Sequence, residues 1–451
     1  MISPSNPSIP STPSIPSKPS NKVLIITYYW PPSGGSGVQR WLKFTKYLRD
    51  FNWEPVIYTP ENPEIPVEDS SLLNDIPKGI TVLKKRIWEP YLFYKKFLGQ
   101  KGEDKIQTGF LTEKRKPKQK EKISVWIRGN LFIPDARKFW IRPSVKYLTT
   151  YLKSNPVDII ISTGPPHSMH LIARKLKKKL NIPWLADFRD PWTNIDLYED
   201  LKLTRWADKK HKKQEQSVIK EADSLIVVGS TLKKEYQNMC ANNVSVITNG
   251  YDQADYIDDD ICLDKKFSIM HAGTITFSRN PTEFWLVLSD LVNEHKDFAE
   301  DLEIKLIGKI DLSVNENIAR LGLEKFVVKT NYLSHKEATR EQRKSHILFL
   351  PINNTQNAKG IITGKLFEYL AAGRPILGIG PANGDAAEII NDTKAGLISG
   401  FGDNNRLKNN ILALYQNYKK GELQIRSGDV SKYSRKNLTE NLVELLNTSV
   451  K

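Results

Sequence analysis

A short segment near residue 365 places a cation and a carboxylate at the start of a predicted helix. In ITGKLFEYLAAGRP, residues 362–375, Lys365 and Glu368 are three positions apart and lie on one helix face. A lysine there can neutralise a diphosphate, and a carboxylate can accept hydrogen bonds from two ribose hydroxyls. The segment fits a nucleoside diphosphate, although an ordinary helical ion pair explains the same spacing. It is not an ATPase loop, because no Ser or Thr follows Lys365 to hold magnesium.

A glycine-rich loop follows the first predicted strand, residues 23–28. Three glycines offer backbone amides at the start of the next helix: Gly34, Gly35 and Gly37. The loop lacks the third glycine of a dinucleotide fingerprint, which disfavours nicotinamide binding. Gln39 and Arg40 come next and would face a cleft if the loop does; a solvated first helical turn is the alternative.

Further polar residues follow two other predicted strands of the first half. His167 ends DIIISTGPPH, and ADFRDPW supplies three charged residues: Asp187, Arg189 and Asp190. A helix N-cap and a structural ion pair explain this cluster of charges as well as a role in the reaction does. The acidic run Asp258–Asp260 lies between predicted domains, where a solvated linker is the default. No HExxH or other metal-ligand spacing is present, so we expect no metal site and no cofactor.

Predicted strands and amphipathic helices alternate twice along the chain, which predicts two Rossmann-like, doubly wound α/β domains facing one interdomain cleft. A basic and aromatic insertion, about residues 83–146, is too long for an ordinary connection within the first domain. The predicted parts are a Ser/Pro-rich disordered leader, a first domain, a second domain and a C-terminal helix that packs back on the domains: residues 1–21, 22–255, 256–430 and 431–451.

The charge of the chain is concentrated in its first half. The 451 residues carry a net charge of +16, and residues 1–250 hold 41 Lys and Arg against 24 Asp and Glu. The stretch 84–122 alone holds 13 basic and 5 acidic residues among aromatic ones, which suits docking on an anionic membrane as well as a soluble flexible loop. No apolar run reaches the roughly 18 residues of a spanning helix, and only two cysteines occur. We expect a cytoplasmic protein, or a peripheral one on the cytoplasmic face of a membrane.

Several segments together resemble a known enzyme family. GKLFEYLAAGRPIL is similar to the donor-nucleotide signature of glycosyltransferase family 4, whose members have the GT-B fold. Other segments match in the same order, from about residue 22 to 447: YYWPPSGGSGVQRWLKFTKYL, ADFRDPW, VITNGYD and HAGTITFSRNP. The resemblance implies a hexosyltransferase that moves a sugar from a nucleoside-diphosphate sugar to a hydroxyl acceptor, with retention of configuration and without a metal.

The resemblance also implies roles for individual residues. Glu368 would bind the ribose, Lys365 and Arg279 the diphosphate, and Gly273 would allow close backbone approach. Because Gly360 stands where the family commonly has a sugar-binding acidic residue, sugar recognition would pass to the backbone amides from Ile361 to Gly364, which include those of Ile362 and Thr363. His167 and Asp190 would act near the sugar, with the catalytic cations Arg279 and Lys365 stabilising the leaving diphosphate. The acceptor side would comprise Gly34, Gly35, Gln39 and Arg40.

The expected partners are a nucleotide sugar, a glycan or lipid-linked acceptor in polysaccharide or glycolipid synthesis, and an anionic membrane surface. Two alternatives remain: a nucleotide-sugar epimerase on the same fold, and a noncatalytic nucleic-acid binder. The second is disfavoured because the basic residues accompany no nucleic-acid-binding module, so no nucleic acid is expected.

Overall fold

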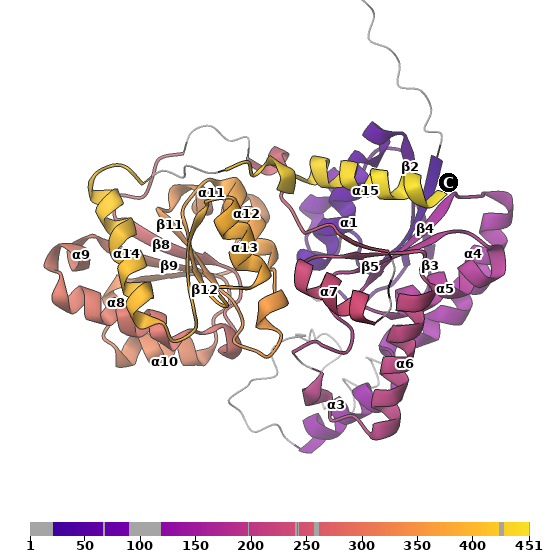
Figure 1. The fold of residues 1–451 in the computed structure, drawn as a ribbon, viewed down its shortest axis with the longest axis horizontal. Coiled ribbons are helices and arrows are strands. Elements are labelled where there is room, and N and C mark those ends of the chain that lie inside the picture. Colours follow the sequence, from indigo (N-terminus) through magenta and orange to yellow (C-terminus); the bar gives the residue numbers. More distant parts are fainter. Residues whose placement is uncertain are drawn as a thin grey trace, which may run out of the picture.

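The computed structural model describes residues 21–65, 68–89, 119–196, 198–239, 241, 243–256, 261–423 and 428–450. They form two parallel sheets, each with helices on both faces, side by side in Figure 1. The predicted fold class, two doubly wound α/β domains, is confirmed. The leader up to residue 20, the insertion between residues 90 and 118 and the acidic run Asp258–Asp260 lie outside the described residues.

The first sheet has the order β3-β2-β1-β4-β5-β6-β7 with all neighbours parallel. Its strands are β1 (Asn21–Ile26), β2 (Trp53–Pro60), β3 (Thr81–Lys85), β4 (Ile159–Gly164), β5 (Trp184–Phe188), β6 (Ser224–Val227) and β7 (Val244–Val246). The principal helices are α1 (Ser36–Leu48), α3 (Gln119–Leu131), α4 (Ile141–Ser154), α5 (Ser168–Leu180), α6 (Arg205–Glu221) and α7 (Ser230–Asn238). Strand β3 was not predicted, because TVLKK is an edge strand with little burial and no continuous apolar run.

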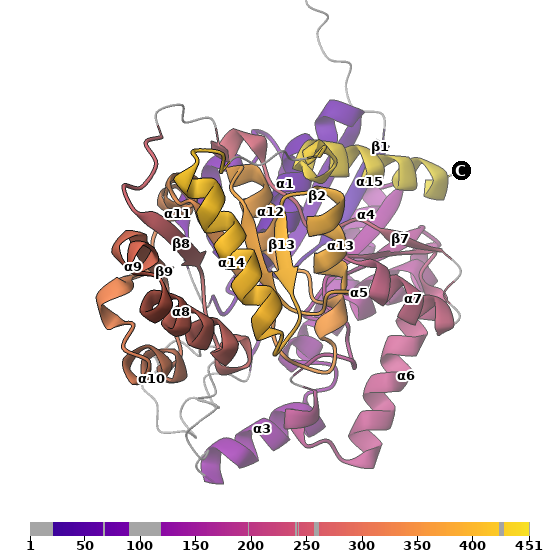
Figure 2. The ribbon, with the colours of Figure 1, turned by 60° about the vertical axis from the view of Figure 1, so that its left-hand side comes forward.

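The second sheet has the order β10-β9-β8-β11-β12-β13. Its strands are β8 (Phe267–Ala272), β9 (Leu302–Ile307), β10 (Val327–Thr330), β11 (Ile347–Pro351), β12 (Ile376–Ile379) and β13 (Gly396–Ser399). The helices are α8 (Thr282–Glu294), α9 (Lys296–Asp301), α10 (Leu312–Arg320), α11 (His335–Lys344), α12 (Gly364–Ala372), α13 (Asp385–Asp392) and α14 (Asn404–Lys419). Figure 2 shows α8 and α14 over the face of this sheet that is turned forward, whereas α12 and α13 pack against the opposite face.

Each sheet is buried on both faces, which explains the continuous apolar runs of its strands. In β1, Leu24 and Ile26 pack in the core on one face, and Val23 and Ile25 pack in the core on the other. Both cores are built mainly from aliphatic strand residues and the apolar stripes of flanking helices. The two sheets are therefore rigid platforms whose connecting loops are free to carry a site.

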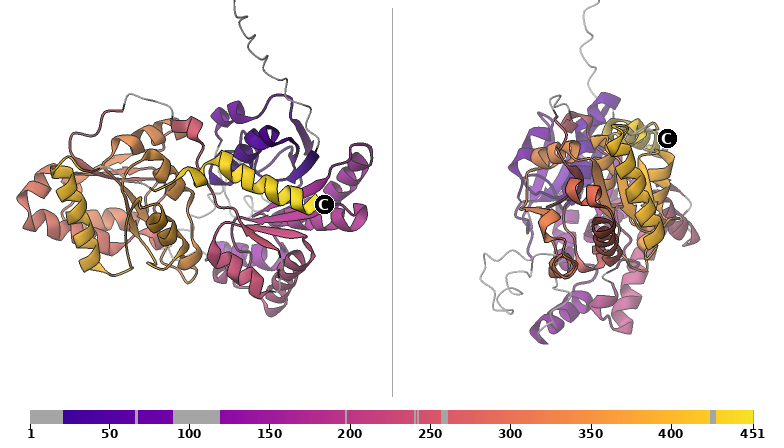
Figure 3. Two further views of the ribbon diagram at one scale, coloured as in Figure 1. Left: turned by 45° about the horizontal axis from the view of Figure 1, so that its top comes forward. Right: turned by 90° about the vertical axis from the view of Figure 1, so that its left-hand side faces the viewer.

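The chain passes between the domains twice. It leaves the first domain through the short helix η5 (Gln253–Tyr256) and returns through α15 (Arg435–Val450). Leu438, Leu442 and Leu446 of α15 are buried in the first-domain core with residues of α1, and Figure 3 shows this helix lying across the first domain. The last helix of the chain thus ties the two domains together. Among the described residues, no helix is both long and apolar enough to cross a membrane.

Candidate functional site

A small cavity of about 60 Å³ lies where the interdomain connection meets both domains. Gln39 of α1 lines it from the first domain, and Gly364 and Glu368 of α12 line it from the second. Gln39, which was predicted for the acceptor side, therefore lines the same cavity as Gly364 and Glu368, which were predicted for the donor side. The other lining residues come from η5 and its flanks and from neighbouring helices: Lys43, Asn249, Gly250, Tyr251, Asp252, Asp255, Tyr256, His335 and Arg435.

Glu368 is an ionised hydrogen-bond acceptor on a well-anchored helix. The apolar face of α12 is buried through Leu366, Phe367, Tyr369 and Leu370, which leaves Glu368 on the cavity side. Its Oε2 accepts hydrogen bonds from Lys365 Nζ and from Gln342 Nε2, both at 3.0 Å. Burial alone would raise the pKa of Glu368, but the charges of Lys365 and His335 and the bond from Gln342 bring it below its ordinary value.

A glycine lies beside Lys365, and a second cation, Arg279, follows the same strand as this glycine. Gly273 follows β8 with a φ of 137°, in the region that favours glycine. A Cβ added there would lie 3.1 Å from Cε of Lys365, so a side chain would crowd the lysine. Arg279 is oriented by two hydrogen bonds, from Nε to Asn353 Oδ1 at 2.9 Å and from Nη1 to the Thr274 carbonyl at 3.3 Å. Positive charge is thus held at the carboxyl end of β8.

The loop before α12 packs against the first domain. A Cβ at Gly360 would lie 3.3 Å from Cγ2 of Thr231, so this position has little room for the acidic side chain common in family 4. Ile362 packs toward Gly229, whose added Cβ would lie 2.9 Å from Ile362 Cδ1. Thr363 has a buried hydroxyl with no partner among the described residues. The contacts of Gly360 and Ile362 place this loop directly against α7 and the residue before it.

Next to this loop, a set of hydrogen bonds that the sequence did not predict joins the two domains. Asp385, at the start of α13, accepts hydrogen bonds from Ser230 Oγ at 2.8 Å and from Thr231 Oγ1 at 2.7 Å. It also accepts from the Thr231 backbone N–H at 3.1 Å, so a second-domain carboxylate caps helix α7 of the first. Nothing local in the sequence indicated this pairing, since the partners are 154 and 155 residues apart.

The sequence predicted that Arg40 lies on an open acceptor surface, but Arg40 is buried. Its guanidinium is 1% exposed and pairs with Asp187, with Nη2 at 2.9 Å from Oδ1. It also donates to the carbonyls of Ile247 and Thr248, at 2.8 and 2.7 Å. Asp187 therefore belongs to a structural ion pair, as one of the two interpretations of the sequence held. Arg40 fixes the segment after β7 and does not face a substrate site.

The remaining first-domain candidates lie around the loop after β4. His167 is nearly buried and stacks on Trp192 with ring centroids 4.4 Å apart. Burial lowers its pKa well below 6.5, so its ring is neutral. Arg189 donates to the Gly37 carbonyl at 2.7 Å and to that of Pro165, which ties the glycine loop to the β4 loop. Asp190, next to it, is exposed.

Gly34 and Gly35 lie in the loop before α1. Gly35 has a φ of 89° and open space where a Cβ would be. Neither glycine lines the cavity beside Glu368 or the larger pocket between the domains. Among the described residues, no group of three or more His, Cys, Asp or Glu side chains is arranged to hold a metal ion.

A larger pocket of about 670 Å³ lies between the domains, where a cleft was predicted, but its lining residues were not predicted. The loop after β5 and the first turns of α6 line one side, and Thr355, Gln356 and Asn357 line the other. Asp196 in this pocket is near Arg279: burial lowers the pKa of the guanidinium, and the Asp196 carboxylate partly offsets that effect. The pocket therefore adjoins the cationic end of β8. Its only sequence signal was the long polar loop between ADFRDPW and α6.

Comparisons with known proteins bear on the family and the fold of the chain. The family model of Glycosyltransferase Family 4 matches residues 102–255. The comparison with curated proteins gave no match.

Solved structures similar to the chain cover nearly its whole length. A sucrose-phosphate synthase from Thermosynechococcus elongatus has a TM-score of 0.60 at 12% identity, over 95% of this chain and 98% of that one. A glycosyltransferase from Rickettsia africae has a TM-score of 0.60 at 14% identity, over 96% and 99%. A UDP-N-acetylglucosamine 2-epimerase has a TM-score of 0.51 at 11% identity, over 95% and 96%. Residues 102–255 thus match glycosyltransferase family 4, and the chain has the GT-B fold of these similar structures.

Proposed function

We propose that the protein transfers a hexosyl group from a nucleoside-diphosphate sugar to a hydroxyl acceptor with retention of configuration, in polysaccharide or glycolipid synthesis. The observation that carries the proposal is the pairing of an ionised carboxylate, Glu368, with Lys365 beside Gly273. A second cation, Arg279, lies close enough to act with them on the buried His271. A carboxylate accepts hydrogen bonds from ribose hydroxyls, and cations bind the diphosphate. Retention follows from the resemblance to family 4.

In this proposal the bond between the sugar C1 and the diphosphate oxygen breaks as the acceptor oxygen bonds to C1. The acceptor proton passes to the departing diphosphate, so atoms and charges balance. Lys365 and Arg279 stabilise the negative charge that develops on the diphosphate, without a metal ion. Closure of the domains over the reacting groups excludes water, which would otherwise hydrolyse the donor.

We further propose that the acceptor binds in the pocket of about 670 Å³, which adjoins Arg279 through Asp196. Its size suits a sugar-sized or larger ligand. Asn194, Asp196, Gln356 and Asn357 offer amide and carboxylate groups for hydroxyls. This proposal places the acceptor site at the loop after β5, whereas the sequence predicted it at the loop before α1.

An exposed surface of apolar and basic side chains at the end of the first domain fits a lipid-linked acceptor. Large apolar side chains between 41% and 62% exposed lie on or beside α3 and α6: Trp88, Ile123, Trp126, Leu131, Phe139 and Trp206. Lys138 Nζ is 5.0 Å from the Phe139 ring, and Lys210 Nζ is 4.6 Å from the Trp206 ring. Figure 1 shows α3 and α6 extending below the first sheet. We propose that this surface docks the enzyme on an anionic membrane, on its cytoplasmic face.

Vesicle sedimentation tests this docking. We expect binding to vesicles that contain phosphatidylglycerol and none to neutral phosphatidylcholine vesicles, since each cation near an anionic surface contributes about 1 kcal/mol. Replacing Trp206 and Lys210 together by serine should weaken binding, while Lys408→Ser in the second domain should not. Equal binding to both vesicle types, or to neither, would contradict the proposal.

The donor is tested by thermal denaturation with a panel of nucleotide sugars. A donor that binds only the folded protein raises the melting temperature, by mass action. Product analysis with the stabilising donor then separates transfer from epimerisation, because an epimerase changes the donor without an acceptor. Conversion without acceptor would favour the epimerase alternative.

A further inference from the structure

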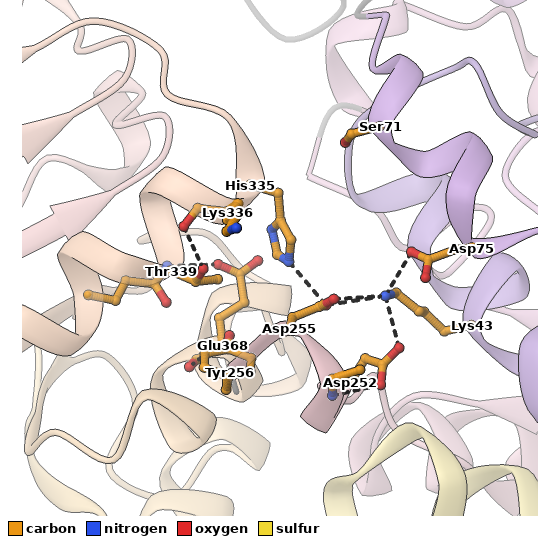
Figure 4. Close-up of polar contacts among 12 residues, drawn as sticks. Lys43, Ser71, Asp75, Asp252, Asp255, Tyr256, His335, Lys336, Thr339 and Glu368 are labelled. Carbon is orange, nitrogen blue, oxygen red and sulfur yellow. Dashed lines mark hydrogen bonds and ion pairs between the residues drawn. The ribbon is translucent and has the colours of Figure 1, made fainter. Parts of the chain in front are cut away.

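A series of charged groups leads from the first domain toward Glu368. Lys43 of α1 lies 2.9 Å from Asp75, 2.9 Å from Asp252 and 3.1 Å from Asp255. Lys43 and Asp252 are almost fully buried, with side chains 3% and 1% exposed. Figure 4 shows Lys43 between these three carboxylates, with His335 on the far side of Asp255 and Glu368 beside His335. The series therefore crosses the domain boundary.

The helix η5 connects the two domains and contacts both donor-side helices. Asp255 Oδ2 lies 3.2 Å from Nε2 of His335 on α11, and Tyr256 donates its hydroxyl to the Glu368 carbonyl at 3.3 Å. On its other side, Asp252 accepts from Lys46 at 2.7 Å and from Tyr47 at 2.6 Å, both in α1. A change in the angle between the domains must therefore disturb the surroundings of Glu368.

Helix α11 presents two residues to Glu368. Its start is held by a capping box, in which Ser334 and Glu337 bond each other's backbone, so the position of His335 is well defined. Gln342 lies seven residues later on the same face, is fully buried and donates to Glu368 Oε2 at 3.0 Å. His335 lines the same cavity as Glu368. The helix thus supports the donor carboxylate at two places.

The charged groups around His335 come from three packed elements. The hydrogen bond to Asp255 of η5 raises the pKa of His335 and burial opposes this; Glu368 of α12 raises the pKa further, and Lys43 of α1 lowers it. The balance leaves the pKa above its ordinary value of 6.5. Protonated His335 would be bonded to one carboxylate and attracted to the other.

We propose that His335 is a positioning residue for the donor nucleotide, which holds Glu368 in place through charge and couples donor binding to the interdomain connection through Asp255 and Lys43. The inference rests on the proposed function in that Glu368 is taken as the ribose-binding group. As pH rises and His335 loses its proton, the donor should bind more weakly.

The first test needs no ligand. Titration of the histidine ring carbons by NMR, with the His335 signal assigned from its loss in His335→Gln, gives the pKa of His335 directly. We expect the Glu368→Gln and Asp255→Asn variants each to lower it, since each removes a neighbouring negative charge. An unchanged His335 pKa in Glu368→Gln would overturn the coupling.

The second test measures binding of UDP, ADP and GDP by calorimetry from pH 6 to pH 9. For the nucleotide that binds, we expect His335→Gln to weaken binding about ten-fold at pH 6, the effect of one pKa unit, and to match the wild type at pH 9. In turnover the donor KM should rise with little change in kcat.

His295→Gln, at an exposed surface histidine, is the control. Equal pH profiles for wild type and His335→Gln would overturn the proposal. If the wild type bound none of the three, the proposed function would fail, while the NMR titration would still decide the coupling.

Discussion

Replacement of Glu368 by alanine is expected to abolish sugar transfer while leaving the fold intact, and replacement of Lys365 is expected to do the same. In the proposed function Glu368 accepts hydrogen bonds from the ribose, and its Oε2 is already positioned by Lys365 and Gln342. Loss of a charge-assisted hydrogen bond and of a cation at the departing diphosphate should each cost several kcal/mol of transition-state stabilisation, so activity should fall by about 10²-fold or more. Transfer from the stabilising donor, assayed with purified variants, measures the loss.

A matched variant separates this effect from a general loss of stability. Glu300 is an exposed glutamate on α9, and Glu300→Ala should keep both activity and melting temperature. The Glu368→Ala and Lys365→Ala proteins should melt near the wild type without donor and lose the stabilisation by donor. Wild-type activity in either of these two variants would refute the donor-site assignment.

Replacement of Asp187 by alanine should destabilise the first domain by about 3–5 kcal/mol, because the buried charge of Arg40 would be left without a partner. Asp187 is fully buried and also accepts from Trp41 Nε1 at 2.7 Å and from Thr163 Oγ1 at 2.8 Å. Urea denaturation followed by tryptophan fluorescence measures the change. Glu221→Ala, which breaks a partly exposed pair with Arg174, should cost less than about 1 kcal/mol. Equal effects of the two substitutions would contradict this assignment.

The same ion pair predicts a pH dependence. Burial would raise the pKa of Asp187, but Arg40, Trp41 and Thr163 together lower it below its ordinary value. A carboxyl whose pKa is lower in the folded than in the unfolded state contributes stability above the unfolded value, about 4, and loses it as pH falls through the folded pKa. The difference in stability between wild type and Asp187→Ala should therefore shrink in acid.

Several features could be predicted from the sequence because they depend on neighbouring residues. Apolar runs such as VLII and the periodic helices between them specify two doubly wound sheets, since each strand is buried on both faces. The three-residue spacing of Lys365 and Glu368 places them together on α12 whatever surrounds the helix. The edge strand β3 escaped prediction because its burial is slight and its residues are largely polar.

Other features depend on segments far apart in the chain. Arg40 reads as a surface residue after a glycine loop, and only its pairing with Asp187, 147 residues later, makes it part of the core. The larger interdomain pocket, the cap of α7 by Asp385 and the contact between His335 and Asp255 likewise join separate elements. By itself the sequence determined the two domains and the residue pair on α12, because local periodicity and spacing encode them. Only the tertiary structure decided which charges are buried partners and which line a cavity, because burial and pairing arise when distant segments pack together.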